Sequence, residues 1–376
     1  MIQVRPVQTR VDITRFIDFP YDLYRDDPHF VPELFIAQRD HLNPQKNPFF
    51  EHAVSALFLA EQDGRVVGRI GVVQDDLLIE YTREKVGVFG FFEVVDDYET
   101  AKVLLDTAKE WISSRGLEWM EGPYNFSTNH AAGLLIDGFN FSPAVMMTFN
   151  KPYYQAFLER YGLNKKTDVL AYHIEANQFP LRLEKNLKLL EERLVSKGIT
   201  IRNIDLKHFQ SDVKRALSVY NGAWSNNLGF APFTEKEFLH VAADMKLIMD
   251  PNLVFIAEKE GKAVGFSLAV PDVNEIQKNI RRGRLLPFGI FKLLFGKHKI
   301  KKVRIIALGV LEEYRRLGID ACFYAKAFLY VKNHKTLEAG EASWILEDNV
   351  EMNQALVKMG GIVQKKYRFY RMKLAN

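Results

Sequence analysis

Residues 58–73 read FLAEQDGRVVGRIGVV, and residues 255–270 read FIAEKEGKAVGFSLAV. Phenylalanine, alanine, glutamate, glycine and valine recur at matching places in the two stretches. Each stretch predicts a β-hairpin, in which two apolar strands flank a turn at Asp63-Gly64 or at Glu260-Gly261. An acidic residue followed by glycine favours such a turn because both positions tolerate a positive φ.

A second repeated pattern lies near the end of each half of the chain. Gln155-Ala156 followed by Gly162 matches Gln354-Ala355 followed by Gly361 at nearly the same spacing. The repeating unit is too long for a solenoid, so the pattern predicts a duplicated domain. We expect domains at residues 1–180 and 181–376. The expected fold class is mixed α/β, with a central, mostly antiparallel mixed sheet flanked by helices in each domain.

Composition limits the class of protein. The chain has 376 residues, 47% apolar and 26% charged, which is typical of a globular protein with two domains. The net charge of +4 does not call for nucleic acid, and the single cysteine, Cys322, excludes a disulfide framework. No histidine and carboxylate spacing predicts a metal site. The N-terminus lacks the apolar core of a signal peptide, so we expect a cytoplasmic protein.

The strongest chemical signal is KVRIIALGVLEEYRRLGIDACFYAKAFLYV, residues 302–331. A dense apolar strand ends at Val310, a basic turn follows at residues 315–318, and a helical pattern begins after Gly318. The amide groups of a first helical turn bind anions, and the helix dipole favours negative charge there. The segment therefore predicts a phosphate site.

This segment resembles the phosphate loop of the acyl-CoA N-acyltransferase (GNAT) superfamily, Arg/Gln-x-x-Gly-x-Gly/Ala after a strand that ends in valine. Arg315, Gly318 and Val310 match that pattern, whereas Asp320 stands where the family prefers glycine or alanine. The spacing of Asn349 and Gly360 also fits the family's last helix. The resemblance implies that acetyl-CoA or a longer acyl-CoA is held by Leu308, Gly309, Val310, Arg315, Arg316, Leu317, Gly318, Ile319 and Asn349.

The resemblance also implies a mechanism. The amide of Val310 stabilises the oxyanion when an amine attacks the thioester, and a carboxylate takes the amine proton. Glu347 and Glu341 are the candidate bases, and Tyr367, with Tyr370 as a second choice, is the candidate acid. The tyrosine that the family usually places on the last helix is replaced by Leu356.

The first half lacks the phosphate loop. Its equivalent segment carries Asp96, Asp97 and Glu99, which repel phosphate. The resemblance therefore implies a degenerate GNAT-like domain that serves as a lid or acceptor platform. This tandem arrangement is similar to that of N-myristoyltransferase and of the aminoacyltransferases that build peptidoglycan bridges.

Two segments are candidates for the acceptor site. Residues 220–234 combine aromatic and amide side chains that suit an amphipathic acceptor, of which we select Trp224, Asn226, Asn227 and Phe230. Core packing explains the same residues almost as well. Residues 122–133, GPYNFSTNHAAG, either line the acceptor site or form a loop whose polar side chains cap the backbone.

The insert at 278–302, KNIRRGRLLPFGIFKLLFGKHKIKK, is basic and apolar and contains no acidic residue. This combination is typical of an interfacial membrane helix, and the alternative is a helix packed on the other domain. We expect an N-acyltransferase that passes an acetyl or longer acyl group to a small-molecule or lipid amine. A long-chain version at the membrane surface, as in bacterial GNAT-type ceramide synthases, and a non-catalytic CoA-responsive module are the alternatives.

Overall fold

Both predicted hairpins are present in the computed structural model, which describes residues 1–224 and 230–374. The four turn residues have positive φ, at 51° and 76° in the first hairpin and at 50° and 76° in the second, for Asp63, Gly64, Glu260 and Gly261. Two consecutive residues with positive φ match the right-handed twist of the flanking strands. The local turn chemistry therefore decides these hairpins.

The chain divides into two compact units, and neither is continuous in sequence. Unit 1 contains residues 1–169, 276–295 and 365–376, and unit 2 contains residues 170–275 and 296–364. Most of the insert predicted at 278–302 is therefore part of unit 1. The last residues of the chain also belong to unit 1.

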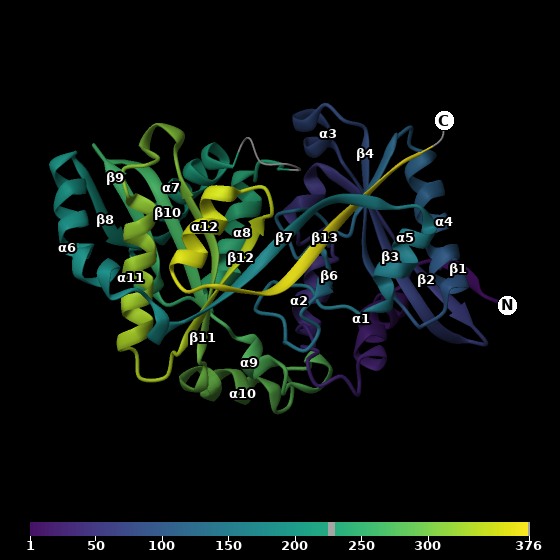
Figure 1. Cartoon of the computed structure of the whole chain (residues 1–376). Helices are drawn as coiled ribbons and strands as arrows, with labels where there is room; N and C mark the ends of the chain where they lie inside the picture. Colours follow the sequence, from purple (N-terminus) through teal and green to yellow (C-terminus); the bar gives the residue numbers. More distant parts are fainter. Residues whose placement is uncertain (225–229, 375–376) are drawn as a thin grey trace. The chain divides into compact units, whose positions relative to one another are not determined.

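Unit 1 has a mixed sheet in the order β1-β2-β3-β4-β5-β13, and β6 also pairs with β13 (Figure 1). The neighbours are antiparallel except for β4 and β5, which are parallel. Its strands are β1 (Gln3–Pro6), β2 (Ala53–Gln62), β3 (Arg65–Asp75), β4 (Val86–Val94), β5 (Trp119–Gly122) and β6 (Leu134–Asp137), with β13 (Ile362–Lys373) from the end of the chain. Its helices are α1 (Arg10–Leu23), α2 (Phe35–His41), α3 (Asp76–Thr82), α4 (Tyr98–Ser113), α5 (Tyr153–Tyr161) and α10 (Gly289–Gly296).

Unit 2 repeats this plan in the order β7-β12-β11-β10-β9-β8. Here β11 and β12 are the parallel pair, and the pairs β8–β9, β9–β10 and β10–β11 are antiparallel. Its strands are β7 (Asn164–Glu175), β8 (Ile199–Asn203), β9 (Val254–Lys259), β10 (Lys262–Pro271), β11 (Lys302–Val310) and β12 (Ala339–Leu346). Its helices are α6 (Leu181–Ser196), α7 (Phe209–Ala223), α8 (Glu235–Lys246), α11 (Ile319–Asn333) and α12 (Val350–Lys358), with the short α9 (Asn274–Gln277) at the boundary.

The last strand of each half completes the sheet of the other unit. Strand β7 follows α5, yet its residues 170–175 belong to unit 2. Strand β13 follows α12, yet Tyr370 pairs with Gly122 and Tyr367 pairs with Leu135, both in unit 1. The sequence repeat places each strand in its own half, and only the long-range pairing reveals this exchange.

One long helix covers a face of each sheet. In unit 1, α4 buries Ala101, Leu104, Leu105, Ala108 and Ile112 completely against the strands. In unit 2, α11 buries its apolar side chains and runs beside α6 (Figure 1), where Lys326 pairs with Glu191 at 2.8 Å. Burial of these apolar faces stabilises both helices.

Candidate functional site

Strands β11 and β12 separate before they end. Their register begins with Lys302 opposite Ala339 and stops with Ile305 opposite Ala342. Strand β11 continues to Val310, and β12 continues to Leu346. Beyond Ile305 and Ala342 the two neighbouring parallel strands are thus no longer paired, which opens the sheet on the β12 side of β11.

The amide of Val310 faces this opening. Leu311 N donates to Val264 O at 3.0 Å, and Val310 stands opposite Gly265. In an antiparallel ladder, this pattern makes Val310 and Gly265 a non-hydrogen-bonded pair, whose polar backbone groups point away from each other. The amides of Val310 and Leu308 are therefore directed toward the side that β12 has left. An extended ligand can add there as a strand does.

The loop after β11 leads directly into the N-terminus of α11. Gly318 is the N-cap and has φ 96°, a left-handed conformation that other residues rarely adopt. No side chain of residues 1–224 and 230–374 caps this end, and the first helical bond runs from Cys322 N to Gly318 O at 3.0 Å. The amides of the first turn are thus available to an anion.

The two arginines of the loop have different surroundings. Arg315 donates through Nη2 to Ala223 O at 3.0 Å and through Nε to Val310 O at 3.4 Å, so it fixes the loop to the end of β11. Arg316 is exposed and lies 3.4 Å from Glu351. Leu317 is half-buried, Ile319 is buried, and the side chain of Asp320 is exposed. Arg315 is therefore held by backbone oxygens, whereas the Arg316 side chain extends into solvent.

Unit 1 has a carboxylate at the equivalent helix. The side chain of Asp97 caps α4 and accepts from Thr100 N at 2.9 Å. Hydrogen bonds from Thr100 lower the pKa of Asp97, which therefore stays ionised. The N-terminus of α4 is thus capped by the ionised side chain of Asp97, whereas no described side chain caps the N-terminus of α11.

Glu347 and Asn349 follow the end of β12. Glu347 is exposed. It follows Ala342 by the same number of residues as Val310 follows Ile305, and Ile305 and Ala342 are the last pair in register. Asn349 is exposed, and its side chain accepts from Met352 N at 3.2 Å, which makes it the N-cap of α12. The fold brings Glu347 to the separated end of the sheet, and gives Asn349 a capping role there.

Glu341 lies elsewhere on β12, in the part that is still paired. It stands opposite Arg304, and both side chains are buried. Ser343 Oγ donates to Glu341 Oε1 at 3.1 Å and accepts from Arg304 Nε at 3.0 Å. At about 3.3 Å per residue, the six positions from Arg304 to Val310 along β11 span roughly 20 Å. The structure does not bring Glu341 to Val310.

The two candidate tyrosines are part of the core of unit 1. Tyr367 is 0% exposed and pairs with Leu135 on β6. Tyr370 is also 0% exposed, and its hydroxyl donates to Glu159 Oε1 at 3.1 Å. Both residues therefore support the packing of β13 on unit 1.

The predicted acceptor aromatics adjoin the donor strand. A side-chain carbon at Gly309 would lie 2.5 Å from Trp224 Cζ3, so only glycine allows this close approach. The Tyr220 ring is 4.7 Å from Trp224 and 5.8 Å from Phe230 between centroids. Trp224 and Phe230 thus belong to one aromatic cluster around Tyr220, and Trp224 is the member that packs against β11. Asn226 and Asn227 lie outside the described residues.

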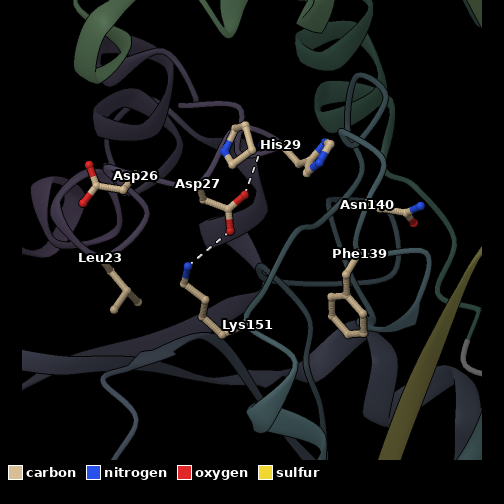
Figure 2. Close-up of a pocket in the computed structure, with 8 residues that line it drawn as sticks. Leu23, Asp26, Asp27, His29, Phe139, Asn140 and Lys151 are labelled. Atoms are coloured by element: carbon tan, nitrogen blue, oxygen red, sulfur yellow. Dashed lines mark hydrogen bonds and ion pairs between the residues drawn. The ribbon is translucent and has the colours of Figure 1, made fainter.

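Sequence reasoning missed two open pockets. One, of about 610 Å³, is in unit 1, where Lys151 lies 3.2 Å from Asp27 and Phe139 and His29 form part of the wall (Figure 2). The other, of about 600 Å³, lies in unit 2 beside Leu311 and Tyr314. Its walls come from residues far apart in sequence, so no local motif predicts it. Two of its cations are already neutralised, since Lys214 pairs with Glu235 and Arg215 with Glu258.

No group of three or more metal-ligating side chains occurs within residues 1–224 and 230–374. None of the helices in that part of the chain has the length and apolar character needed to cross a bilayer.

Comparison with known proteins identifies the family. No family model matches the chain. The chain is 35% identical to the bacterial ceramide synthase of Caulobacter vibrioides over 98% of its length and 97% of that protein. The chain belongs to the bacterial ceramide synthase family. This family member is also 34% identical to Protein YghO of Escherichia coli, over 98% of its own length and 94% of that protein.

Solved structures confirm the fold of this ceramide synthase relative. A tandem GNAT protein from the clavulanic acid biosynthesis pathway covers 100% of the chain with a TM-score of 0.59 and 11% identity, and 99% of that protein is matched. A GCN5-related N-acetyltransferase from Sphaerobacter thermophilus covers 100% of the chain with a TM-score of 0.53 and 13% identity, over 96% of its own length. The predicted mixed α/β tandem GNAT fold is confirmed, and the chain is an acyltransferase of the GNAT type.

Proposed function

We propose that this protein transfers a long acyl chain from acyl-CoA to the amino group of a lipid amine. Its full-length similarity to a bacterial ceramide synthase carries this proposal. A ceramide is the amide of a fatty acid and a long-chain amino alcohol, so its synthesis requires an amphipathic amine as acceptor. The long-chain reaction is therefore favoured over acetylation of a small amine.

The separated end of the sheet supports the position of the donor. The amides of Leu308 and Val310 both face the opening; that of Leu308 suits a carbonyl of the pantetheine arm, and that of Val310 is left for the thioester carbonyl. The uncapped N-terminus of α11 suits the pyrophosphate, because four amides and the positive end of the helix dipole point to it. Arg316, which is exposed, adds a cation.

The chemistry requires one acyl transfer and one proton transfer. The amine nitrogen bonds to the thioester carbon, and the carbon–sulfur bond breaks. The amide of Val310 stabilises the negative oxygen that forms between these events. Glu347 takes the amine proton and returns it to the sulfur of CoA, so the products are an amide and a thiol. Leu356 is buried and aliphatic, so it supplies no proton.

The aromatic cluster supports the acceptor side of the proposal. Trp224 packs against Gly309, the residue before Val310, and Phe230 belongs to the same aromatic cluster around Tyr220. Aromatic side chains provide large apolar contact area with little loss of conformational entropy. Such a surface suits the alkyl part of an amphipathic amine better than a small polar amine.

The test crosses donors with acceptors. The purified protein is incubated with acetyl-CoA, octanoyl-CoA or palmitoyl-CoA, each with sphinganine or with glucosamine. Release of the CoA thiol and the mass of the amide are both measured. We expect amide formation from palmitoyl-CoA and sphinganine, with at least tenfold lower turnover for acetyl-CoA.

Two results contradict the proposal. Turnover of acetyl-CoA with glucosamine alone would establish small-amine acetylation instead. Saturable binding of CoA without turnover of any pair would establish the non-catalytic, CoA-responsive alternative.

A further inference from the structure

An exposed apolar segment lies at residues 286–295 of unit 1. Within ten consecutive residues it exposes six large apolar side chains, namely Leu286, Phe288, Ile290, Phe291, Leu294 and Phe295. The most exposed of these is Leu286 at 78%, and the rings of Phe291 and Phe295 stack on one side of α10. Single exposed apolar residues are ordinary, but a continuous group marks an interaction surface.

The base of this segment is anchored on helices α1 and α2. Arg282 Nη1 lies 2.7 Å from Asp22 Oδ1, and Arg284 Nη2 lies 3.0 Å from Asp18 Oδ1. The guanidinium of Arg284 also lies 3.4 Å from the centre of the Phe35 ring. These contacts hold the backbone before residue 286 against unit 1. The segment is thus fixed at its base while its apolar side chains remain exposed.

The charges around the exposed side chains differ from those at the base. Lys278, Arg281 and Lys292 are exposed, and within residues 1–224 and 230–374 no carboxylate lies in ion-pair distance of them. Lys292 Nζ donates to the backbone oxygen of Asn279 at 2.7 Å, which leaves its charge in place. The arginines at the base are neutralised by aspartates, whereas Lys292 within the segment, and Lys278 and Arg281 just before its base, keep their positive charge.

We infer that residues 286–295 dock on the surface of an anionic lipid bilayer. The inference deepens the proposed function. It rests on that function in one respect, namely that a lipid amine acceptor resides in a membrane. Helix α10 has eight residues and extends about 12 Å, so it lies in the interface rather than across the bilayer. Its apolar side chains insert at the level of the headgroups, and the uncompensated cations contact anionic headgroups.

A bilayer explains this surface better than a second protein chain. Protein interfaces pair their charges and combine an apolar centre with a polar rim of hydrogen bonds. Lys278, Arg281 and Lys292 have no carboxylate in ion-pair distance within the described part of the chain, so a second copy would bring these like charges together. A surface that combines aliphatic and phenylalanine side chains with unpaired cations is typical of interfacial helices.

The test is sedimentation of the full chain with vesicles, without any acyl-CoA. Vesicles of phosphatidylcholine alone are compared with vesicles that also contain phosphatidylglycerol. We expect strong binding to the anionic vesicles only. Each cation removed weakens binding by about fivefold, so K278Q/R281Q/K292Q loses about two orders of magnitude. The variant F288S/F291S/F295S also loses binding, because it removes the inserted side chains.

A matched control changes exposed apolar residues outside the segment. Leu189 and Val195 on α6 are 64% and 59% exposed, and L189S/V195S is expected to bind as the wild type does. All altered residues are exposed, so the variants should fold, which circular dichroism checks. Equal binding by F288S/F291S/F295S overturns the inference. So does a concentration-dependent dimer in analytical ultracentrifugation that this variant abolishes, since that identifies a second copy as the occupant.

Vesicle binding and acyl transfer are separate measurements, so their failures are distinguishable. Binding without turnover of any donor and acceptor pair supports the docking surface and contradicts the proposed function. Turnover with an acceptor dissolved in detergent micelles, together with no vesicle binding, overturns the docking surface alone.

Discussion

Val310, the last residue of β11, and Glu347, the first residue after β12, lie equally far beyond the last pair in register between these two parallel strands. One residue contributes a backbone amide, and the other contributes an exposed carboxylate. An acyl transfer needs both functions, on the carbonyl oxygen and on the amine proton respectively. In the proposed mechanism, the reaction takes place between these two strand ends.

The amide of Val310 is tested by Val310→Pro, which removes the N–H group. Because this amide does not bond to β10, the substitution leaves the antiparallel ladder intact. We expect kcat to fall by about 100- to 1,000-fold with little change in CoA affinity. Val310→Ala keeps the amide and serves as the control. Equal kcat in the two variants would show that this amide does not stabilise the oxyanion.

The carboxylate of Glu347 is tested by Glu347→Gln. We expect kcat to fall by about 100-fold or more. The deficit should shrink as the pH rises, because more of the amine is then already neutral. Asp348→Asn, at the next exposed position, should leave kcat unchanged. If Glu341→Gln instead reproduces the loss and its pH dependence, the base is the buried carboxylate opposite Arg304.

The exchanged strand β13 is held by an ion pair that predicts a pH dependence of stability. Arg368 Nε and Nη2 lie 2.8 and 3.1 Å from the two oxygens of Asp168, which is buried. Burial raises the pKa of Asp168, but hydrogen bonds from Arg368 and Lys165 lower it more, so the pKa is below its ordinary value. The pair therefore stabilises the protein above the unfolded pKa of about 3.9, and this stability is lost as the pH falls through the folded pKa.

Arg368→Leu should accordingly lower the free energy of unfolding by about 3 kcal/mol at pH 7, because it leaves a buried carboxylate without its main partner. Urea denaturation at pH 7 and at pH 3 measures the effect. The difference from the wild type should be smaller at pH 3. A difference that is the same at both values would mean that packing rather than charge fixes β13.

The single thiol reports on opening of α11. Burial raises the pKa of Cys322 to about 12, and the side chain is 0% exposed. The thiolate is the reactive form, so we expect no labelling by a disulfide reagent in the native state, even near pH 9. Labelling should begin with urea unfolding and should slow when a bound donor stabilises the native state. Rapid labelling in native buffer would contradict the position of α11 in the core.

The hairpins and the β11–α11 segment could be read from the sequence because local chemistry decides them. Asp63-Gly64 and Glu260-Gly261 both have positive φ, a conformation that an acidic residue followed by glycine tolerates in a tight turn. An apolar strand followed by a glycine turn and a helix is likewise set by neighbouring residues. Trp224 and Phe230 were chosen as aromatic residues of one segment, and the fold joins them in one cluster in which Trp224 packs against β11.

The positions of the candidate catalytic groups depend on contacts between distant residues. Glu341 and Glu347 are close in sequence, and only the register of β12 with β11 shows that Glu341 lies in the paired part and Glu347 at the open end. Arg282 meets Asp22 across most of the chain, which places the insert on unit 1. Tyr367 belongs to unit 1 because β13 pairs there.

The sequence by itself determined the duplicated α/β plan, the helix that begins after the Gly318 turn and the lack of a matching basic turn in the first half, since strand, turn and helix propensities act over a few residues. Tertiary structure alone decided the exchange of β7 and β13, the separation of β11 from β12 and the anchoring of the apolar segment. Each of these depends on which distant backbones and charges meet, and the free energy of such pairings is not encoded in any single stretch of the chain.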